Sequence, residues 1–163
     1  MEITSLTPPD WEQVCAIYAE GIQSGQATFE VEPPTWERWD QAHLPFGRLV
    51  ARENSRILGW AALSPVSARR VYAGVAELSI YIAAAERGRG IGQELMQALI
   101  ACAELNGIWT LQAVIFPQNT ASIRLHERNG FRLVGRREKI ARLRGVWQDT
   151  LLFERRSRVV GID

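Results

Sequence analysis

The sequence predicts a single domain of the mixed α/β (α+β) class, in which a mostly antiparallel sheet is flanked by helices. A length of 163 residues suffices for one well-packed core and is short for two. Segments with the apolar periodicity of strands are interspersed with segments of helical periodicity. A glycine-rich turn, "RGRGIG" at residues 87–92, joins a strand pattern to a long helical pattern. Only that connection needs a crossover helix, so we expect a mixed sheet.

The first half of the chain predicts two helices followed by three strands. Thr7 and Asp10 are spaced as a capping pair around two prolines, and "WEQVCAIYAEGI" follows with one apolar helical face. A second helix begins at Thr35, and the aperiodic segment 23–34 before it is expected to form a wall of a substrate site. "GRLVAR" and "ILGWAALSP" read as a hairpin around "ENS", and "GVAELSIYIA" alternates as a third strand.

The second half predicts a helix, a strand, a helix and a closing pair of strands. "GQELMQALIACAELNG" repeats apolar residues at helical spacing and stops at Gly107, and "IWTLQAVIF" is typical of a buried strand. "NTASIRLHERNG" begins a helix at Asn119 and ends it at Gly130, before the strands "FRLVGRREKI" and "VWQDTLLFERR". No repeat or linker interrupts this order, so residues 1–163 are expected to form one domain.

Composition indicates a cytoplasmic protein. A net charge of +1 gives no general attraction to nucleic acid or membrane. No apolar run approaches the roughly 20 residues of a membrane span, and "MEITSLTPPD" lacks the features of a signal peptide. Cys15 and Cys102 are isolated and are expected to be reduced core thiols. With only His43 and His126 as histidines, we expect no metal site.

The glycine turn does not match either common nucleotide-binding device. A P-loop ends in Gly-Lys-Ser/Thr, and this turn contains no lysine. A dinucleotide fingerprint needs GxGxxG and an acidic residue about 20 positions later, whereas the spacing from Gly88 is GxGxG and the next strand ends "VIFPQN". A tight turn that needs positive φ is an alternative, but one glycine would suffice for that. Alternate residues without Cβ let an anion reach the N–H groups of the helix N-terminus, and Arg87 and Arg89 add positive charge, so we predict a pyrophosphate cradle.

These motifs resemble those of the GCN5-related N-acetyltransferase (GNAT) superfamily. "RGRGIG" fits its Arg/Gln-x-x-Gly-x-Gly/Ala signature, and "FPQNTASIRLHERNGF" fits its Asn-x-x-(Ala/Ser)-x-x-x-(Tyr/His)-x-x-x-Gly-Phe segment. "ATFEVEPPTWERW", "RRVYAGVAELSIYI" and "GVWQDTLLFER" are similar to the branch that acetylates phosphinothricin and methionine sulfoximine. The match spans nearly the whole chain and implies the GNAT fold, acetyl-CoA as cosubstrate and a homodimer that pairs around the substrate site.

The resemblance also implies which residues bind acetyl-CoA. The turn and helix start would hold the pyrophosphate, the backbone of the central strand would pair with the pantetheine arm, and the second motif would lie near the cofactor. The residues expected in these roles are Ile80, Tyr81, Ile82, Arg87, Gly88, Arg89, Gly90, Ile91, Gly92, Gln93, Asn119 and Ser122.

Two residues are expected to move protons. Glu77 lies within an otherwise apolar strand, at the position where the family places its base. The alternative is a surface carboxylate on the solvent-exposed face of the strand. His126 occupies a position where many relatives have a tyrosine that acts as general acid toward the CoA thiolate. A helix-capping or cofactor-contacting histidine is the alternative.

The acceptor site departs from the pattern of the branch. That branch commonly reads Tyr-Arg-x-Thr-x-Glu, and here Ala73 and Val75 replace the arginine and the threonine. We expect Phe29 and Trp36 to form an apolar wall, and Glu30 or Glu32 to meet the ammonium. Arg70 and Tyr72 are expected to bind a carboxylate, and Glu77 is expected to be part of the substrate site.

The predicted activity is direct transfer of an acetyl group from acetyl-CoA to the amine of a small amino-acid-like molecule. Acetylation of a peptide or protein N-terminus, or of another small amine, is an alternative of the same chemistry. A non-catalytic acyl-CoA sensor on the same fold is an alternative of another class.

Overall fold

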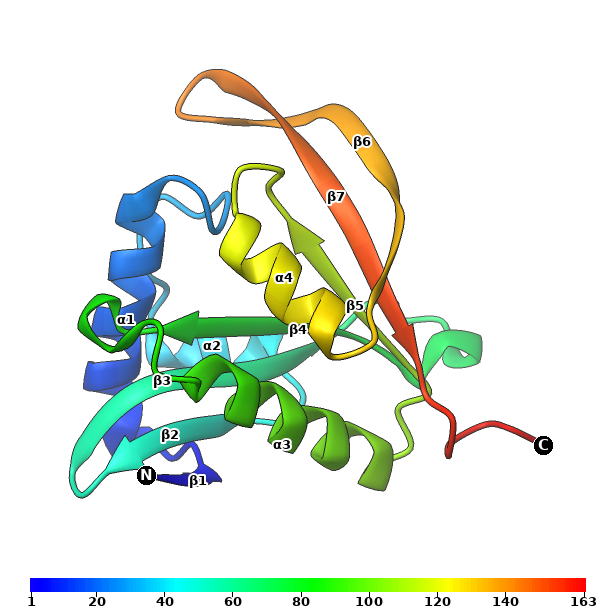
Figure 1. Ribbon diagram of the computed structural model, residues 1–163, viewed down its shortest axis with the longest axis horizontal. Coiled ribbons are helices and arrows are strands. Elements are labelled where there is room, and N and C mark those ends of the chain that lie inside the picture. Colours follow the sequence, from blue (N-terminus) through cyan, green and yellow to red (C-terminus); the bar gives the residue numbers. More distant parts are fainter.

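The computed structural model describes residues 1–163 and contains a seven-stranded mixed sheet (Figure 1). The strands are β1 (Glu2–Ser5), β2 (Leu49–Glu53), β3 (Arg56–Pro65), β4 (Val75–Ile82), β5 (Thr110–Ile115), β6 (Arg132–Leu143) and β7 (Val146–Arg156). Their order in the sheet is β1-β2-β3-β4-β5-β7-β6. Only β4 and β5 pair in parallel, which confirms the mixed, mostly antiparallel sheet expected from the single crossover.

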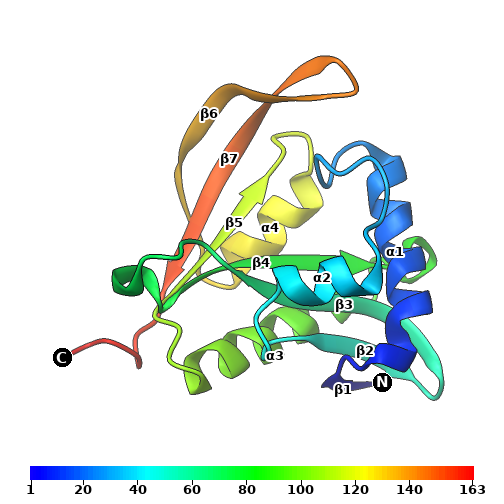
Figure 2. The ribbon, with the colours of Figure 1, turned by 180° about the vertical axis from the view of Figure 1, so that it is seen from behind.

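Helices cover both faces of this sheet. They are α1 (Trp11–Ser24), α2 (Trp36–Ala42), α3 (Ile91–Leu105) and α4 (Thr120–Arg128), with short 3-10 turns η1 (Pro8–Asp10), η2 (Arg70–Tyr72) and η3 (Ala84–Glu86). The view from behind shows α1 and α2 on the face opposite α3 and α4 (Figure 2). The chain contains no helix that combines the length and the apolar character of a membrane span.

Each face of the sheet carries its own hydrophobic core. The helix α3 turns Leu95 and Leu99, both fully buried, into the larger core together with Leu63 of β3. On the other face, Val14 of α1 and Trp39 of α2 pack against Trp60 of β3. Strand β3 is buried from both sides because it lies between these cores, and its long apolar run follows from that position.

The strands β4 and β5 pair only at their beginning and then diverge. Their register covers Val75–Glu77 against Thr110–Gln112, and no pairing continues beyond it. Past this point β4 remains paired with β3 as far as Ile82, whereas β5 follows β7 along its whole length. Figure 1 shows β5 and β7 leaving the direction of β4. The edge of β4 that faces β5 is therefore free of strand partners from Leu78 onward.

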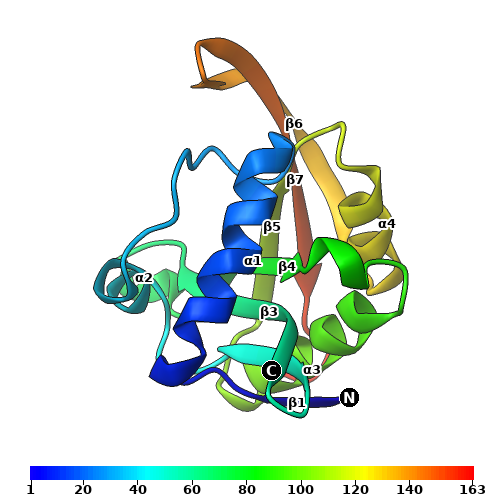
Figure 3. The ribbon, with the colours of Figure 1, turned by 90° about the vertical axis from the view of Figure 1, so that its left-hand side faces the viewer.

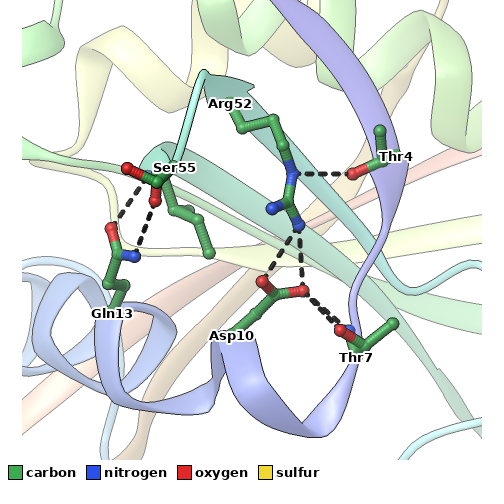
Figure 4. Close-up of polar contacts among 7 residues, drawn as sticks. Thr4, Thr7, Asp10, Gln13, Arg52 and Ser55 are labelled. Carbon is green, nitrogen blue, oxygen red and sulfur yellow. Dashed lines mark hydrogen bonds and ion pairs between the residues drawn. The ribbon is translucent and has the colours of Figure 1, made fainter.

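A polar cluster anchors the N-terminal segment to the sheet (Figure 4). The carboxylate of Asp10 accepts hydrogen bonds from the N–H and hydroxyl of Thr7 at 2.9 and 3.0 Å, as the predicted capping pair requires. Arg52 of β2 donates to both oxygens of Asp10 at 3.0 Å and to Thr4 at 2.9 Å. Burial raises the pKa of Asp10, but the Thr7 hydrogen bonds and the Arg52 guanidinium outweigh it, so the pKa lies below its usual value.

The sequence-based assignment missed strand β1, which precedes this cluster. The strand is only four residues long, and its pairing with β2 rather than a clear alternation defines it. The closing strands form a hairpin whose tip projects from the body of the molecule (Figure 3). The turn residues Arg144 and Gly145 both have positive φ, as a two-residue hairpin turn requires. Strand β6 continues three residues beyond the predicted end.

Candidate active site

Two adjoining cavities lie along the free edge of β4, each with a volume of about 510 Å³. We name them after the two substrates that the sequence resemblance implies. The acceptor cavity extends between β4, β5 and the β6–β7 hairpin, and the cofactor cavity extends over the glycine turn and the start of α3. Residues shared by both linings are Ala27, Ile80, Tyr81, Asn119 and Ser122. The two spaces therefore meet where β4 and β5 have separated.

The three positions of the turn require glycine for different structural reasons. Gly88 and Gly90 have φ values of +79° and +82°, in the left-handed region that disfavours other residues. A Cβ at either position would meet no protein atom within 4 Å, so the space above them is open cavity. A Cβ on Gly92, inside α3, would lie 3.3 Å from Leu125 of α4. The turn is thus shaped to leave its backbone exposed at the N-terminus of a 15-residue helix, where N–H groups lack helical partners.

Positive charge in the cofactor cavity comes from two elements. Arg87 lies in the turn, and Arg124 and Arg128 are one helical turn apart on α4. None of the three forms an ion pair within the protein. The two arginines of α4 were not among the predicted cofactor residues, because an isolated helical pattern does not show which face it turns toward the glycine turn.

The placement of Arg89 corrects the sequence-based expectation. Its guanidinium does not line the cofactor cavity and instead pairs with the carboxylates of Glu86 and Glu53, the latter at 2.9 Å. Glu86 is buried and also pairs with Arg56 at the start of β3. Arg89 therefore ties the glycine turn to the β2–β3 hairpin, and its contact with a phosphate stays a prediction.

Polar side chains of the second motif hold the cavity walls together. Asn119 caps α4 by accepting a hydrogen bond from the Ser122 N–H at 3.2 Å, and its amide donates to the carbonyl of Gln26 at 3.3 Å. Gln93 of α3 and Asn129 exchange two hydrogen bonds of 3.0 and 2.9 Å. These contacts fix α4 against both the α1–α2 loop and α3, so that Asn119, Ser122 and Gln93 all border the cofactor cavity.

Glu77 lies at the last position of β4 that pairs with β5, beside the point where the two strands diverge. It is half-buried, lines the acceptor cavity, and its Oε2 accepts a hydrogen bond of 2.8 Å from Gln112 of β5. The other carboxylate oxygen has no hydrogen-bond donor within the protein. The carboxylate is therefore oriented from one side and open to a ligand from the other.

His126 is almost fully buried and lines the same cavity from α4. Its Nδ1 lies 2.7 Å from the carbonyl oxygen of Ser122, which can only accept, so Nδ1 carries the proton. Its Nε2 is buried without a hydrogen-bond partner. Burial lowers the pKa of His126, and the Ser122 hydrogen bond opposes this only in part. A neutral imidazole with a bare Nε2 does not suit the general-acid role expected from the sequence, because Nε2 has no proton to give.

The segment between α1 and α2 forms a wall of the acceptor cavity. Phe29 stacks edge-on against Phe116, with ring centroids 4.9 Å apart, and both rings line the cavity. Tyr18 and Tyr81 also meet edge-on at 4.9 Å beside Glu30. Burial raises the pKa of Tyr81, so its hydroxyl stays protonated near neutral pH. Within segment 23–34, the residues 27–30 line this cavity, and the role of the segment as a wall of the substrate site stays a prediction.

Arg70 and Tyr72 are not brought into this cavity, contrary to the expectation that they bind a carboxylate. They belong to η2, before the start of β4, and both are exposed and line neither cavity. The guanidinium of Arg69 lies over the Tyr72 ring, 5.6 Å from its centroid. The arginine that does line the acceptor cavity is Arg137 of β6, which no sequence motif had indicated.

Comparison with known proteins identifies the family. The model of the acetyltransferase (GNAT) family matches residues 11–131. Phosphinothricin N-acetyltransferase of Streptomyces coelicolor is 34% identical over 90% of this chain and 90% of its own length. L-methionine sulfoximine/L-methionine sulfone acetyltransferase of Pseudomonas paraeruginosa is 31% identical over 89% of this chain and 88% of its own length.

Solved structures agree with this assignment. The phosphinothricin acetyltransferase of Sinorhizobium meliloti in complex with AcCoA has a TM-score of 0.86 and 27% identity, covering 99% of this chain and 96% of that one. Ribosomal-protein-alanine N-acetyltransferase of Brucella melitensis has a TM-score of 0.89 and 29% identity, covering 96% and 100%. The divergent sheet and the glycine turn define an N-acetyltransferase. The chain belongs to the acetyltransferase (GNAT) family, and the relatives above support the phosphinothricin and methionine sulfoximine branch of it.

Proposed function

We propose that residues 1–163 form one N-acetyltransferase domain that transfers the acetyl group of acetyl-CoA directly to the amine of a small amino-acid-like molecule, of the phosphinothricin or methionine sulfoximine type. The observation that carries this proposal is the meeting of two cavities at the free edge of β4, with Glu77 on the acceptor side. The glycine turn borders one cavity and the open carboxylate borders the other. A donor and an amine can therefore approach each other there.

The cofactor cavity fits acetyl-CoA in its chemistry. The open space over Gly88 and Gly90 would take the pyrophosphate against the N–H groups from Ile91 onward, with Arg87 as a charge partner. Ile80–Ile82 are paired with β3 on one side, and their other edge, which has no strand partner, would bind the amides of the pantetheine arm as a neighbouring strand would. Arg124 and Arg128 offer further phosphate contacts from α4.

Glu77 is the proposed base of the reaction. The nitrogen of the acceptor forms its bond to the acetyl carbon only as a neutral amine. The carbon–sulfur bond then breaks, and the leaving thiolate takes up the proton that the nitrogen loses as it becomes an amide, which gives free CoA. The free oxygen of Glu77 accepts the proton of the ammonium, directly or through water, while Gln112 holds the other oxygen. His126 lines the same cavity, and its Nε2, which has no hydrogen-bond partner, is buried.

Two observations support transfer without a covalent enzyme intermediate. Neither Cys15 nor Cys102 lines a cavity. The hydroxyl of Ser122 lies 3.4 Å from Nδ1 of His126, but that nitrogen already carries a proton and cannot activate the hydroxyl.

A homodimer is part of the proposal. The β6–β7 hairpin projects from the body and exposes apolar side chains, namely Leu133, Val134, Ile140, Val146 and Trp147. Ile140 also lines the acceptor cavity, so a second copy seated on the hairpin would lie close to the acceptor site.

Release of free thiol from acetyl-CoA tests the function with a panel of amines that includes phosphinothricin, methionine sulfoximine and a peptide with a free N-terminus. We expect release with the amino-acid analogues and a loss of about 10²- to 10⁴-fold in kcat for Glu77→Gln, with acetyl-CoA affinity retained. Glu32→Gln is the control, because Glu32 is exposed and lines neither cavity. Activity with the peptide alone would assign the acceptor to the protein N-terminus class, and release by no amine would refute the proposal.

A further inference from the structure

Arg137 and Thr150 face each other across the β6–β7 hairpin. They are register partners on antiparallel strands, so their side chains lie on the same face of the hairpin, and both line the acceptor cavity. Thr150 is fully buried, yet its hydroxyl has no hydrogen-bond partner. Arg137 is exposed at the cavity and forms no ion pair. Two residues with hydrogen-bond donors thus line one cavity, and neither side chain has a hydrogen-bond partner in the protein.

The neighbouring residue of each strand lies on the opposite face of the hairpin. Arg136 and Asp149 pair with each other, the Nε of Arg136 donating to Oδ2 at 2.8 Å, and neither lines the cavity. The register breaks after Arg137, and the N–H of Lys139 donates to Oδ1 of Asp149 at 2.8 Å. This irregularity adds Ile140 to the cavity wall, as bulges beside binding sites commonly do.

The charges that line the cavity are suited to a ligand with two opposite ends. Glu30 and Glu77 supply carboxylates, and Arg137 is the only arginine or lysine in the lining. A guanidinium with an adjacent hydroxyl matches the oxygens of a carboxylate, since the planar fork of arginine donates two parallel hydrogen bonds. An amine held at Glu77 would leave a carboxylate on the same molecule free to reach Arg137.

We propose that Arg137 and Thr150 bind the carboxylate of the acceptor and make the enzyme selective for amino acids over simple amines. This inference rests on the proposed acetyl transfer. It assigns a guanidinium to the acceptor site of a chain in which Ala73 replaces the arginine usual in the branch and Arg70 lies outside the cavity.

The test compares two acceptors that differ only in the carboxylate: L-methionine sulfone and 3-(methylsulfonyl)propylamine. We expect Arg137→Gln to lower kcat/KM for the amino acid at least tenfold, mainly through KM, and to leave the simple amine unchanged. Thr150→Val, which keeps the shape of the side chain, should lower the same value several-fold. Arg136→Gln is the matched control on the other face of β6 and should change neither. An equal effect of Arg137→Gln on both acceptors, or none on either, would overturn the inference.

A second measurement separates this inference from the proposed function. If wild type acetylates the simple amine at least as well as the amino acid, acetyl transfer stands and the carboxylate site is refuted. If wild type acetylates neither, the proposed function fails, and calorimetric binding of N-acetyl-L-methionine sulfone decides the inference alone. Binding that Arg137→Gln weakens at least tenfold would support the carboxylate site, and equal or undetectable binding to the two proteins would refute it.

Discussion

Gly90→Ala separates the two consequences of a glycine in the cofactor turn, its conformation and its open surface. Gly90 has φ of +82°, where an L-residue costs about 1–2 kcal/mol. For a domain of this size each kcal/mol lowers Tm by about 2–4 °C, so we expect a fall of about 2–8 °C. The new methyl group meets no protein atom within 4 Å and occupies the space proposed for the pyrophosphate. Loss of one hydrogen bond to a charged group costs about 1.5–3 kcal/mol, which corresponds to a roughly 10- to 150-fold weaker Kd for CoA.

Gly107→Ala is the matched control for this variant. Gly107 follows α3, has φ of +79°, and would also place its Cβ at least 4 Å from any protein atom. Because the two φ angles are similar, Gly107→Ala should cause the same backbone strain as Gly90→Ala. Gly107 lines neither cavity, so the affinity for CoA should not change.

Calorimetric titration with CoA and thermal unfolding of both variants provide the readouts. We expect similar falls in Tm and a loss of affinity confined to Gly90→Ala. Wild-type affinity in Gly90→Ala would refute the pyrophosphate cradle. An equal loss in Gly107→Ala would show that reduced stability, and not the open surface, governs binding.

Two further predictions concern stability. Asp10→Asn should lower the free energy of unfolding by about 1.5–3 kcal/mol, because Arg52 loses its charged partner. Urea unfolding at pH 7 measures this change, and an unchanged free energy of unfolding would show that the ion pair does not contribute to stability. Burial lowers the pKa of both His126 and His43 in the folded protein. Below pH 6.5 the unfolded chain therefore binds more protons than the folded one. The free energy of unfolding should fall from pH 6.5 to 5, by up to about 1.4 kcal/mol per pH unit for each histidine. His43→Gln should reduce that slope, and stability that is constant or rises on acidification would contradict the assignment.

The local elements could be predicted from sequence because their signals are local. Thr35 accepts the hydrogen bond of an N-cap from the Arg38 N–H at 3.3 Å, and Gly130 ends α4 with φ of +82°. The glycine turn was recognisable for the same reason, since its spacing excludes other phosphate-binding devices.

The acceptor site could not be read in this way because register and divergence create it. Arg70 lies close to Glu77 in sequence, but η2 places it before β4 and outside the cavity. Arg137 lines the cavity only because β7 pairs with both β5 and β6. Arg89 pairs with the carboxylate of Glu53, which lies 36 residues away in the sequence. Such partners depend on tertiary structure, which periodicity does not encode.

The short pairing between β4 and β5 also determines how firmly the two halves of the sheet are held together. Beyond Glu77 and Gln112 no interstrand hydrogen bonds join the leaf formed by β1–β4 to the leaf formed by β5–β7. The angle between the leaves is therefore set by side-chain packing and by the polar links at the ends of α4. Changes in those few contacts can widen or narrow the gap without breaking any strand pairing, which leaves the width of the acceptor site adjustable while the sheet stays intact.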